Sequence, residues 1–347
     1  MIVFSKSSGT NNAQIGKLDT PIKMAIQHES DICLKNDKIR KELFNVMKSS
    51  RFGETIVGQT EFEEFKAALE GAGAENDTIE ETYNKFIEHI QFMKEFTITA
   101  EMMEDANYGL AASGKARAEN FTRAYYKTMT QACTKALING TSKSFKFNNA
   151  TVDTTVFDGL PLFHKAHKLT ATKAKGKTQC NLFCAEGLTD PEKIQTLLAE
   201  LAVKQRNFTN EQGDEKLGYI SDIVILPGNQ AKQEIAFKKA LGTERSAGSN
   251  INDINIQFGN WSLIVLPEWQ TDAPAFMVMS SEANKQLQGN LFFDRIPLTI
   301  TNWVDNHTGN YIWNGRCRFG VGFGTYKHIM LCKEGATVDG CEPITLA

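Results

Sequence analysis

The 347-residue sequence is 41% hydrophobic and 23% charged, which suits one large soluble domain or two ordinary ones. Its formal net charge of -3 gives no reason to expect nucleic acid or an anionic membrane as the main partner. No apolar run reaches about 18 residues, and the chain is too polar after Met1–Phe4 for a secretory signal, so we expect no membrane span and no export. Seven scattered cysteines without a Cys-x-x-Cys pair favour reduced thiols in a cytoplasm.

The first part of the chain predicts an arm followed by a short helix. About 25 residues are rich in Ser, Asn, Gly and Lys, a composition typical of an extended segment that needs a partner surface to become ordered. A helix is predicted from Ser30 to Met47, with Ser30 or Asp31 as its cap. Its apolar positions have roughly helical spacing: Ile32, Ile39, Leu43 and Val46.

The segment Arg51–Phe96 has the features of a long projecting loop or hairpin. Its middle, "TEFEEFKAALEGAGAENDTIEET", is acidic and broken by Gly71 and Gly73, with a short helix predicted on each side of the glycines. The following "EHIQFMKEFTIT" alternates and predicts a strand, interrupted by Lys94. One face of that strand would carry Ile90, Phe92, Phe96 and Ile98.

The longest predicted helix runs from about Leu110 to Ile138. Apolar residues recur three or four positions apart, and Asn139-Gly140 forms a C-terminal stop. A short helix capped by Thr99 should precede it. The recurring apolar residues are Phe121, Tyr125, Met129, Ala132 and Ala136.

A mixed α/β region and then a strand-rich end are predicted to follow. Thr189 and Glu192 form a capping box before a helix that carries Ile194, Leu197, Leu198 and Leu201. A buried strand ends at Pro227, a short helix lies between Asn229 as cap and Gly242 as stop, and "WSLIVLPEW" is another strand. Two long alternating runs, "FFDRIPLTITNWV" and "YIWNGRCRFGVGFGTYKHIML", predict an antiparallel hairpin.

The glycines at 320, 322 and 324 in "RCRFGVGFGTYKHIML" do not form a nucleotide-binding motif. A dinucleotide fingerprint needs a third glycine where Thr325 stands, followed by a helix, and no helical pattern follows. Strand alternation explains the run better and sets the three glycines on one face with Arg316 and Arg318. We expect these glycines to let another element, such as the long helix, pack closely.

The order of these elements resembles the major capsid proteins of tailed bacteriophages, including relatives of the Mu-type head subunit. The resemblance is carried by "FTITAEMMEDANYG" before the long helix, by "FDGLPLFHKAHK" from Phe157 to Lys168, and by the terminal "NWVDNHTGNYIWNGRCRFGVGFGTYKHIML". The second matches a similar pattern in that family, D-G-x-x-L-F-x-x-x-H. The resemblance implies an α+β Hong Kong 97-type capsid fold with an N-terminal arm, an extended E-loop, a P domain with a long spine helix, and an A domain.

On this resemblance, the chain divides into five parts. They are the arm and short helix at 1–50, the E-loop at 51–99, the P domain with its spine helix at 100–155, mainly the A domain at 156–290, and returning P-domain strands at 291–347. The implied function is self-assembly, as hexamers and pentamers, into the icosahedral shell of a tailed phage or prophage. The implied partners are a separate scaffolding protein, a portal, a decoration protein and packaged DNA bound without sequence specificity. The shell would form in the host cytoplasm and become the virion capsid.

No motif indicates an enzyme or a cofactor. The best metal candidate is His164-x-x-His167 followed by Cys180-x3-Cys184, whose residue types all bind zinc. Their order is not that of a common zinc finger, so a surface loop with ordinary histidines is favoured and no metal is expected. An encapsulin-like nanocompartment shell is the alternative within the fold, and a zinc-binding enzyme is the alternative outside it.

Overall fold

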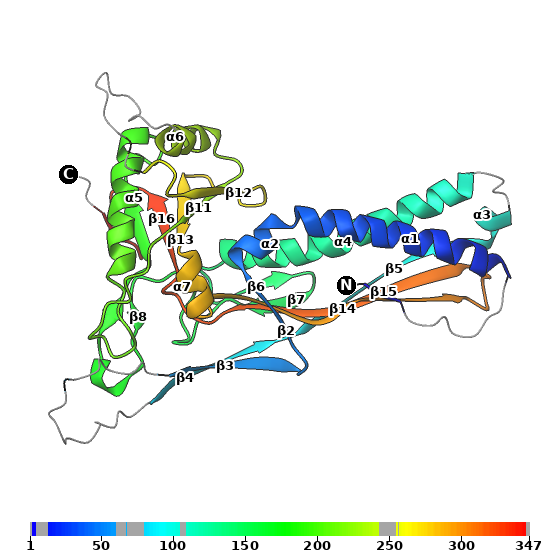
Figure 1. Cartoon of the computed structure of the whole chain (residues 1–347), viewed down its shortest axis with the longest axis horizontal. Coiled ribbons are helices and arrows are strands. Elements are labelled where there is room, and N and C mark those ends of the chain that lie inside the picture. The colour runs from blue at the N-terminus through cyan, green and yellow to red at the C-terminus, as the bar shows by residue number, and fades with distance from the viewer. Residues whose placement is uncertain are drawn as a thin grey trace. The chain divides into compact units, whose positions relative to one another are not determined.

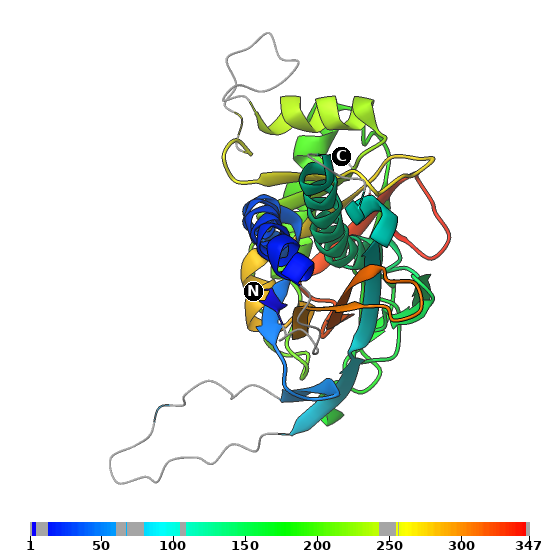
Figure 2. The ribbon, with the colours of Figure 1, turned by 90° about the vertical axis from the view of Figure 1, so that its right-hand side faces the viewer.

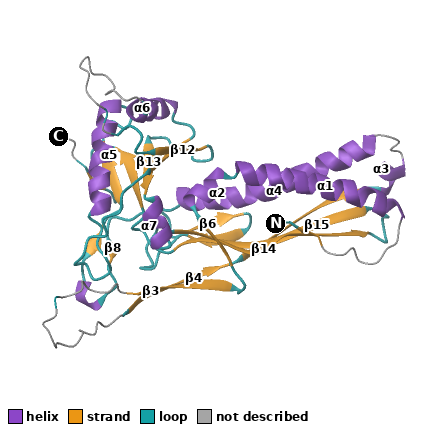
Figure 3. Cartoon of the chain, in the orientation of Figure 1, coloured by secondary structure: helices purple, strands orange, loops and turns teal. Residues whose placement is uncertain are grey.

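The computed structural model describes residues 2–4, 13–59, 67, 80–104, 109–242, 255 and 257–344. It divides into two compact units, whose elements are labelled in Figure 1 and coloured by type in Figure 3. Unit 1 comprises Met1–Glu54, Ile87–Cys133 and Phe292–Val321. Unit 2 comprises Thr55–Phe86, Thr134–Leu291 and Gly322–Ala347. Each unit therefore collects segments that lie far apart in the sequence.

Unit 1 is built on a five-stranded sheet in which β1, β14, β15 and β5 pair in that order and β2 pairs with β14. Its strands are β1 Val3–Phe4, β2 Asn45–Lys48, β5 Ile90–Ile98, β14 Asn290–Val304 and β15 Tyr311–Phe323. Its helices are α1 Ala13–Asn36, α2 Lys38–Leu43, α3 Ala100–Glu104 and α4 Gly109–Ile138. The helices α1 and α4 lie side by side (Figures 1 and 2).

The core of unit 1 forms where these helices meet the sheet. The Phe96 ring on β5 stacks on Trp313 of β15, with ring centroids 5.2 Å apart and an angle of 5° between the ring planes. The centroid of the Phe121 ring on α4 lies 5.2 Å from that of Phe96. The Ser30 hydroxyl on α1 bonds to the Tyr126 hydroxyl on α4 at 2.7 Å. Apolar packing of this kind supplies most of the stability of such a layer. The cluster contains Ile2, Ile22, Ala25, Ile26, Ile98, Ala118, Phe121, Leu298, Ile300, Tyr311 and Trp313.

The expectation of an extended N-terminal arm over about the first 25 residues is wrong from Ala13 onward, because helix α1 spans Ala13–Asn36. The low average hydrophobicity of this stretch conceals Ile22 and Ile26, which are 2% and 0% exposed in the core of unit 1. The predicted helix Ser30–Met47 therefore begins too late, and it also ends too late, because β2 starts at Asn45. Ser30 bonds to Tyr126 from the middle of α1 instead of capping a helix. The rest of the expected arm, residues 1 and 5–12, lies outside the described residues.

Other predictions for unit 1 are confirmed. The long helix was expected at Leu110–Ile138 and α4 spans Gly109–Ile138. Thr99 caps α3, because its hydroxyl oxygen accepts a hydrogen bond from the Met102 amide at 3.3 Å. Strand β5 occupies Ile90–Ile98, as its alternation predicts, and Lys94, which interrupts the apolar face, is exposed. The short helices expected beside Gly71 and Gly73 lie outside the described residues.

Unit 2 contains a six-stranded sheet with the strand order β12-β11-β13-β16-β10-β17. Its strands are β10 Leu182–Ala185, β11 Ile223–Pro227, β12 Ser262–Leu266, β13 Ala275–Met279, β16 Ile329–Glu334 and β17 Glu342–Pro343. The helices of the unit are α5 Pro191–Arg206, α6 Ala231–Leu241 and α7 Ser281–Gln286, with a short 3-10 helix at Thr172–Ala174. Three two-stranded sheets pair β3 Gly53–Gln59 with β4 Glu81–Glu88, β6 Ser144–Phe147 with β7 Ala150–Asp153, and β8 His167–Lys168 with β9 Thr178–Gln179.

Two helix caps in unit 2 differ from prediction. Helix α5 has the expected buried residues, but its N-cap is Asp190 and not Thr189, because the Asp190 carboxylate accepts a bond from the Glu192 amide. Asn229 does not cap α6; its side chain donates to the Thr271 carbonyl at 2.9 Å. The N-cap position of α6 is Gln230, whose side chain makes no capping hydrogen bond.

The long C-terminal run predicted as one strand is two strands in different sheets. Strand β15 ends at Phe323, and β16 begins at Ile329 and pairs with β13 and β10 in unit 2. The resemblance assigns all of 291–347 to returning P-domain strands, whereas β16 and β17 belong to the six-stranded sheet of unit 2. Between the two strands, the Asn181 side chain donates to the Tyr326 carbonyl at 3.5 Å, and it also donates to the carbonyl of Ile329, where β16 begins, at 3.2 Å.

The glycines allow close packing, as expected, but the long helix does not lie against the run at 320–324. A Cβ on Gly320 would lie 2.7 Å from Cδ2 of His89 and 2.9 Å from the Glu88 carbonyl oxygen, where β4 connects to β5. Helix α4 approaches β15 at Gly315 instead, where a Cβ would lie 2.3 Å from Cζ of Phe121. The strand interpretation of the run is confirmed over Tyr311–Phe323.

Candidate functional site

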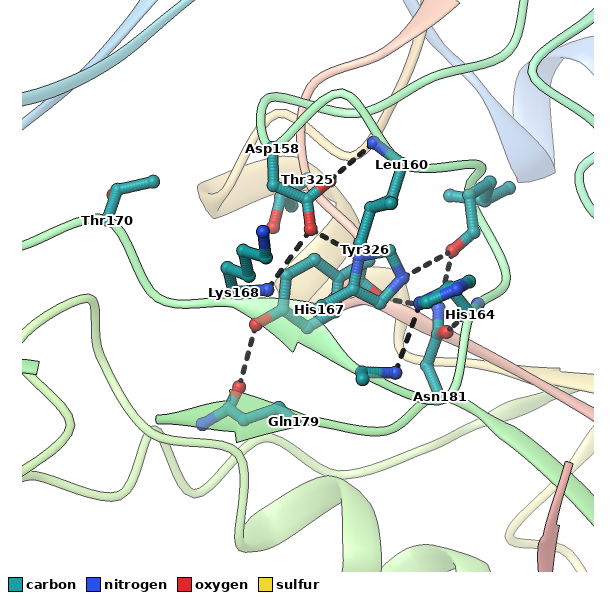
Figure 4. Close-up of polar contacts among 12 residues, drawn as sticks. Asp158, Leu160, His164, His167, Lys168, Thr170, Gln179, Asn181, Thr325 and Tyr326 are labelled. Carbon is teal, nitrogen blue, oxygen red and sulfur yellow. Dashed lines mark hydrogen bonds and ion pairs between the residues drawn. The ribbon is translucent and has the colours of Figure 1, made fainter. Parts of the chain in front are cut away.

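A set of buried polar contacts in unit 2 is built around the "FDGLPLFHKAHK" loop. Leu160 donates its amide to Oδ1 of Asp158 at 2.9 Å, and Gly159 takes a left-handed φ of 72°, which closes a tight turn that favours glycine. The turn brings Oδ2 of Asp158 within 2.8 Å of Nδ1 of His167. Both side chains are almost wholly buried, at 2% and 0% exposure. The first and last residues of the D-G-x-x-L-F-x-x-x-H pattern are thus partners (Figure 4).

Both ring nitrogens of His167 face acceptors. Nδ1 meets the Asp158 carboxylate, and Nε2 lies 3.2 Å from the Leu162 carbonyl oxygen. An ionised carboxylate only accepts hydrogen bonds, so Nδ1 is the donor in the contact with Asp158. Burial is the largest single influence on the pKa of Asp158 and acts to raise it. The hydrogen bond and charge interaction with His167 and the hydrogen bonds from the Leu160 and Lys168 amides act in the opposite direction. Together they outweigh burial, so the pKa of Asp158 is lowered.

The His167 ring stacks on Tyr326, and this contact joins the loop to the strands of the sheet. The ring centroids are 3.9 Å apart and the planes differ by 6°. The Tyr326 hydroxyl donates to Oε1 of Gln179 at 3.0 Å. Burial, followed by the charges of Glu211 and Asp158, raises the pKa of Tyr326 well above its ordinary value. The phenol is therefore a neutral hydrogen-bond donor and is unsuited to act as a nucleophile.

A second buried ion pair lies next to this stack. Nζ of Lys327 is 2.5 Å from Oε1 of Glu211, with side-chain exposures of 4% and 9%. Oε2 of Glu211 accepts from the amide and the hydroxyl of Thr170, at 3.1 and 2.9 Å. Asn181 completes the set, because its amide donates to the Leu162 and Ile329 carbonyls at 2.7 and 3.2 Å. We call Asp158, His167, Thr170, Gln179, Asn181, Glu211, Tyr326 and Lys327 the polar junction.

The polar junction holds together three segments of unit 2, and its chemistry is that of a structural clamp. Its charged groups are paired and its other side chains engaged, so no free nucleophile with an adjacent base is available. Pairing of buried charges with complete hydrogen bonding favours one arrangement of the loops over alternatives. The described residues contain no group of three or more His, Cys, Asp or Glu side chains that could hold a metal ion.

The zinc candidates are each engaged elsewhere. His167 uses both nitrogens within the polar junction, and Nδ1 of His164 accepts from the Ala166 amide at 3.1 Å. Sγ of Cys180 lies 3.2 Å from the Leu182 carbonyl, and burial raises its pKa to about 12. Cys184 is buried on β10 with its thiol directed to the Ala336 carbonyl. The structure therefore gives these four residues no shared centre.

Unit 2 also has an open groove of about 450 Å³ over one face of its sheet. Its lining includes Ala275 and Met277 of β13, the residues opposite them on β16, Lys333 and Leu331, and the segment from Trp269 to Pro274. Its volume is within the range of ligand pockets. The carboxylate of Glu334, also in the lining, accepts the amides of Gly187 and Leu188 at 2.9 and 2.8 Å and so acts structurally.

Sequence reasoning named His167 only as a metal candidate and missed Tyr326, Lys327 and Glu211 altogether. The quoted D-G-x-x-L-F-x-x-x-H pattern was the available signal for the Asp158–His167 pair. No local pattern indicates that Tyr326 stacks on a histidine from a distant part of the chain. Contacts of this kind depend on the pairing of β16 with β10.

No family model and no curated protein matches the sequence. Among solved structures, one from Mycobacterium phage Patience is similar over 98% of this chain and 92% of that chain, with 11% identity and a TM-score of 0.50. The capsid of the cyanophage P-SCSP1u is similar over 86% and 88%, with 10% identity and a TM-score of 0.49. The capsid of Myoviridae phage XM1 is similar over 84% and 90%, with 11% identity and a TM-score of 0.47. The chain has the α+β Hong Kong 97-type fold of tailed-phage major capsid proteins.

Proposed function

We propose that the protein is the major capsid protein of a tailed phage or prophage, and that its copies assemble into the icosahedral shell that encloses the genome. The observation that carries the proposal is the match in fold over 98% of the chain to a phage protein. The polar junction and the buried strand β16 give each copy a fixed internal structure. A shell subunit acts through its surfaces, so a structural, non-enzymatic role is the role that this fold supports best.

The two-stranded sheet β3–β4 supports a need for neighbouring copies. Two-stranded sheets are marginally stable in water unless something packs against them. Tyr83 on β4 stacks on Phe157 at 4.1 Å, and Lys85 pairs with Asp153, so the sheet is attached to the rest of unit 2 through β4. Val57 on β3 is nevertheless 46% exposed. In a shell, an adjacent copy would cover this surface.

The parts of the fold receive the following proposed assignments. Helix α4 is the spine helix and unit 1 contains the P domain, while α5, α6 and the six-stranded sheet form the A domain. Strands β3 and β4 are the base of the E-loop. Hexamers and pentamers, a separate scaffolding protein, a portal, a decoration protein and packaged DNA are the proposed partners, with assembly in the host cytoplasm. None of the described helices is long and apolar enough to cross a membrane.

Electron microscopy of the purified, concentrated protein tests the proposal. Closed shells or capsomer rings are the expected result, and a small oligomer or monomer at every concentration would contradict it. Val57→Asp should block assembly, because it places a charge on an apolar contact while the subunit itself stays folded. The far-ultraviolet circular dichroism spectrum of the variant subunit must match that of the wild type.

A further inference from the structure

Two arginine side chains of unit 1 are held at one place, where β4 connects to β5, and a third arginine, the exposed Arg51, supplies one of the carbonyl oxygens that hold them. Nε of Arg295 on β14 donates to the Arg51 carbonyl at 3.1 Å. Nε of Arg318 on β15 donates to the His89 carbonyl at 3.1 Å, and its Nη2 donates to the Phe52 carbonyl at 3.3 Å. Nδ1 of His89 lies 3.1 Å from the same Arg51 carbonyl. We call Arg51, Arg295 and Arg318 the arginine cluster.

The arginine cluster carries positive charge that no carboxylate neutralises. Among the described residues, no ion pair involves any of the three arginines. The carboxylate of Glu54 is in the same area, but it accepts the Ser49 hydroxyl at 2.6 Å. The acceptors that the arginines do use are uncharged carbonyl oxygens, which orient a guanidinium without cancelling its charge.

The buried histidine at the centre of this arrangement adds no further charge. His89 is 2% exposed, and its Nδ1–H donates to the Arg51 carbonyl. Burial is the main reason that the pKa of His89 is lowered, and the charges of Arg318 and Arg295 act in the same direction. The neutral His89 ring therefore holds the Arg51 backbone in place, and the positive charge of this region comes from the arginines.

Gly320 makes this arrangement possible. A Cβ at this position would lie 2.7 Å from the His89 ring and 2.9 Å from the Glu88 carbonyl oxygen, so any larger residue would push this connection away from β15. The carbonyl that holds Arg318 belongs to His89 itself. Gly320 thus lets His89 lie close enough to β15 for its carbonyl to accept the hydrogen bond from Arg318.

The free donors of the arginine cluster determine the kind of ligand. Each guanidinium has five N–H donors; Arg295 uses one of its donors, Arg318 two and Arg51 none within the described residues. A single carboxylate is satisfied by one arginine fork, whereas successive phosphates present many oxygens to several arginines. Phe52 is 61% exposed, and the Arg318 guanidinium lies 5.1 Å over its ring, next to the cluster.

We propose that the arginine cluster binds backbone phosphates of nucleic acid. The choice of nucleic acid as occupant rests on the proposed function, because a shell subunit lies against the packaged genome. Such contacts would be independent of base sequence, since phosphates carry no direct sequence information. The overall charge of -3 would then coexist with one local surface that attracts DNA.

The test measures binding of a labelled DNA duplex to unassembled protein by fluorescence anisotropy across a salt series. Replacing all three arginines by Gln should weaken binding about tenfold or more near 0.1 M salt, and should lower the slope of log K against log salt by about 2 to 3. Arg51→Gln alone should lower the slope by about 1. This single change removes no hydrogen bond within the described residues, so it tests the proposal even if the triple variant misfolds.

A matched variant removes the same charge elsewhere in unit 1. Lys35, Lys38 and Lys41 are exposed on α1 and α2, and their triple Gln variant should retain most of the binding. Equal losses in the two triple variants would overturn the proposal, because general charge would explain both. Competition by polyglutamate as strong as by DNA would also overturn it, in favour of an acidic protein segment.

Electron microscopy of the same preparations separates this proposal from the proposed function. If shells form and the arginine variants bind DNA like the wild type, the DNA-binding role of the arginine cluster is refuted and the proposed capsid function is unaffected. Loss of DNA binding in the arginine variants, from a wild type that never forms shells, would support the cluster and refute the function.

Discussion

Asp158→Asn should destabilise the protein strongly, because it removes the carboxylate of a buried carboxylate–histidine pair. The carboxylate accepts three hydrogen bonds, from His167, Leu160 and Lys168, at 2.8, 2.9 and 3.2 Å. With exposures of 2% and 0%, neither Asp158 nor His167 can exchange its partner for water. Breaking such a pair typically costs about 3 to 5 kcal/mol. The Asn oxygen can still accept the Leu160 amide, so we expect a loss at the lower end, about 3 kcal/mol.

Urea denaturation of unassembled protein, followed by tryptophan fluorescence, measures this loss. The control is Asp339→Asn, which removes the same charge from an exposed residue and should change the free energy of unfolding by less than about 0.5 kcal/mol. A double-mutant cycle with His167→Gln isolates the coupling between the two side chains. A loss below about 1 kcal/mol, or one equal to the control, would refute the argument.

The effect also has a defined pH dependence. The pKa of Asp158 is lower in the folded protein than in the unfolded chain. Its stabilising contribution is therefore present above the unfolded value, about 3.9, and is lost as the pH falls through the folded value. The difference in stability between wild type and Asp158→Asn should shrink on acidification below about pH 4. A constant difference down to the acid unfolding transition would contradict the assignment.

Three further predictions concern helix capping, a buried histidine and glycine packing. Asp190→Ala should cost about 1 kcal/mol in urea denaturation and Thr189→Ala much less, and the reverse order would restore the capping box predicted from sequence. Burial lowers the pKa of His328 to about 3, so His328 should contribute a loss of about 1.4 kcal/mol in the free energy of unfolding per pH unit as the pH falls from 6 to 4. His328→Gln should remove this contribution to the slope of stability against pH. An unchanged slope would contradict a neutral buried ring. Gly315→Ala should cost about 1 to 3 kcal/mol in thermal or urea unfolding, because its Cβ overlaps the Phe121 ring, and a neutral result would mean that α4 does not pack as described.

Local periodicity was sufficient for elements whose buried face is continuous in sequence. Helix α4 and strand β5 repeat their apolar residues at regular spacing, and both lie where the pattern placed them. Helix α1 shows why the same method failed nearby. It buries Ile22, Ala25 and Ile26 among many polar residues and contains Pro21, so the average composition of its first half suggests an arm. A few well-placed side chains against a partner helix outweigh composition.

The polar junction was only partly predictable, for a different reason. Asp158 and His167 are nine residues apart and share a turn, so a sequence pattern connects them. Tyr326 and Lys327 lie just before β16, and the pairing of β16 brings them to the same place. The alternating sequence pattern continues from β15 into β16, so it does not show that these are two separate strands. A strand pattern specifies which side chains share a face but not which sheet a strand joins.

Net charge is a poor guide to the surfaces of this protein for the same reason. A balance of -3 is a sum over the whole chain and does not record which charges are paired. Lys327 and Arg123 are neutralised by Glu211 and Glu29, whereas the hydrogen bonds of Arg295 and Arg318 within the described part of the chain go to carbonyl oxygens. The attraction of a surface for a polyanion depends on the unpaired cations that are close together. A slightly acidic chain can therefore present a strongly basic contact, and pairing in three dimensions decides where that contact lies.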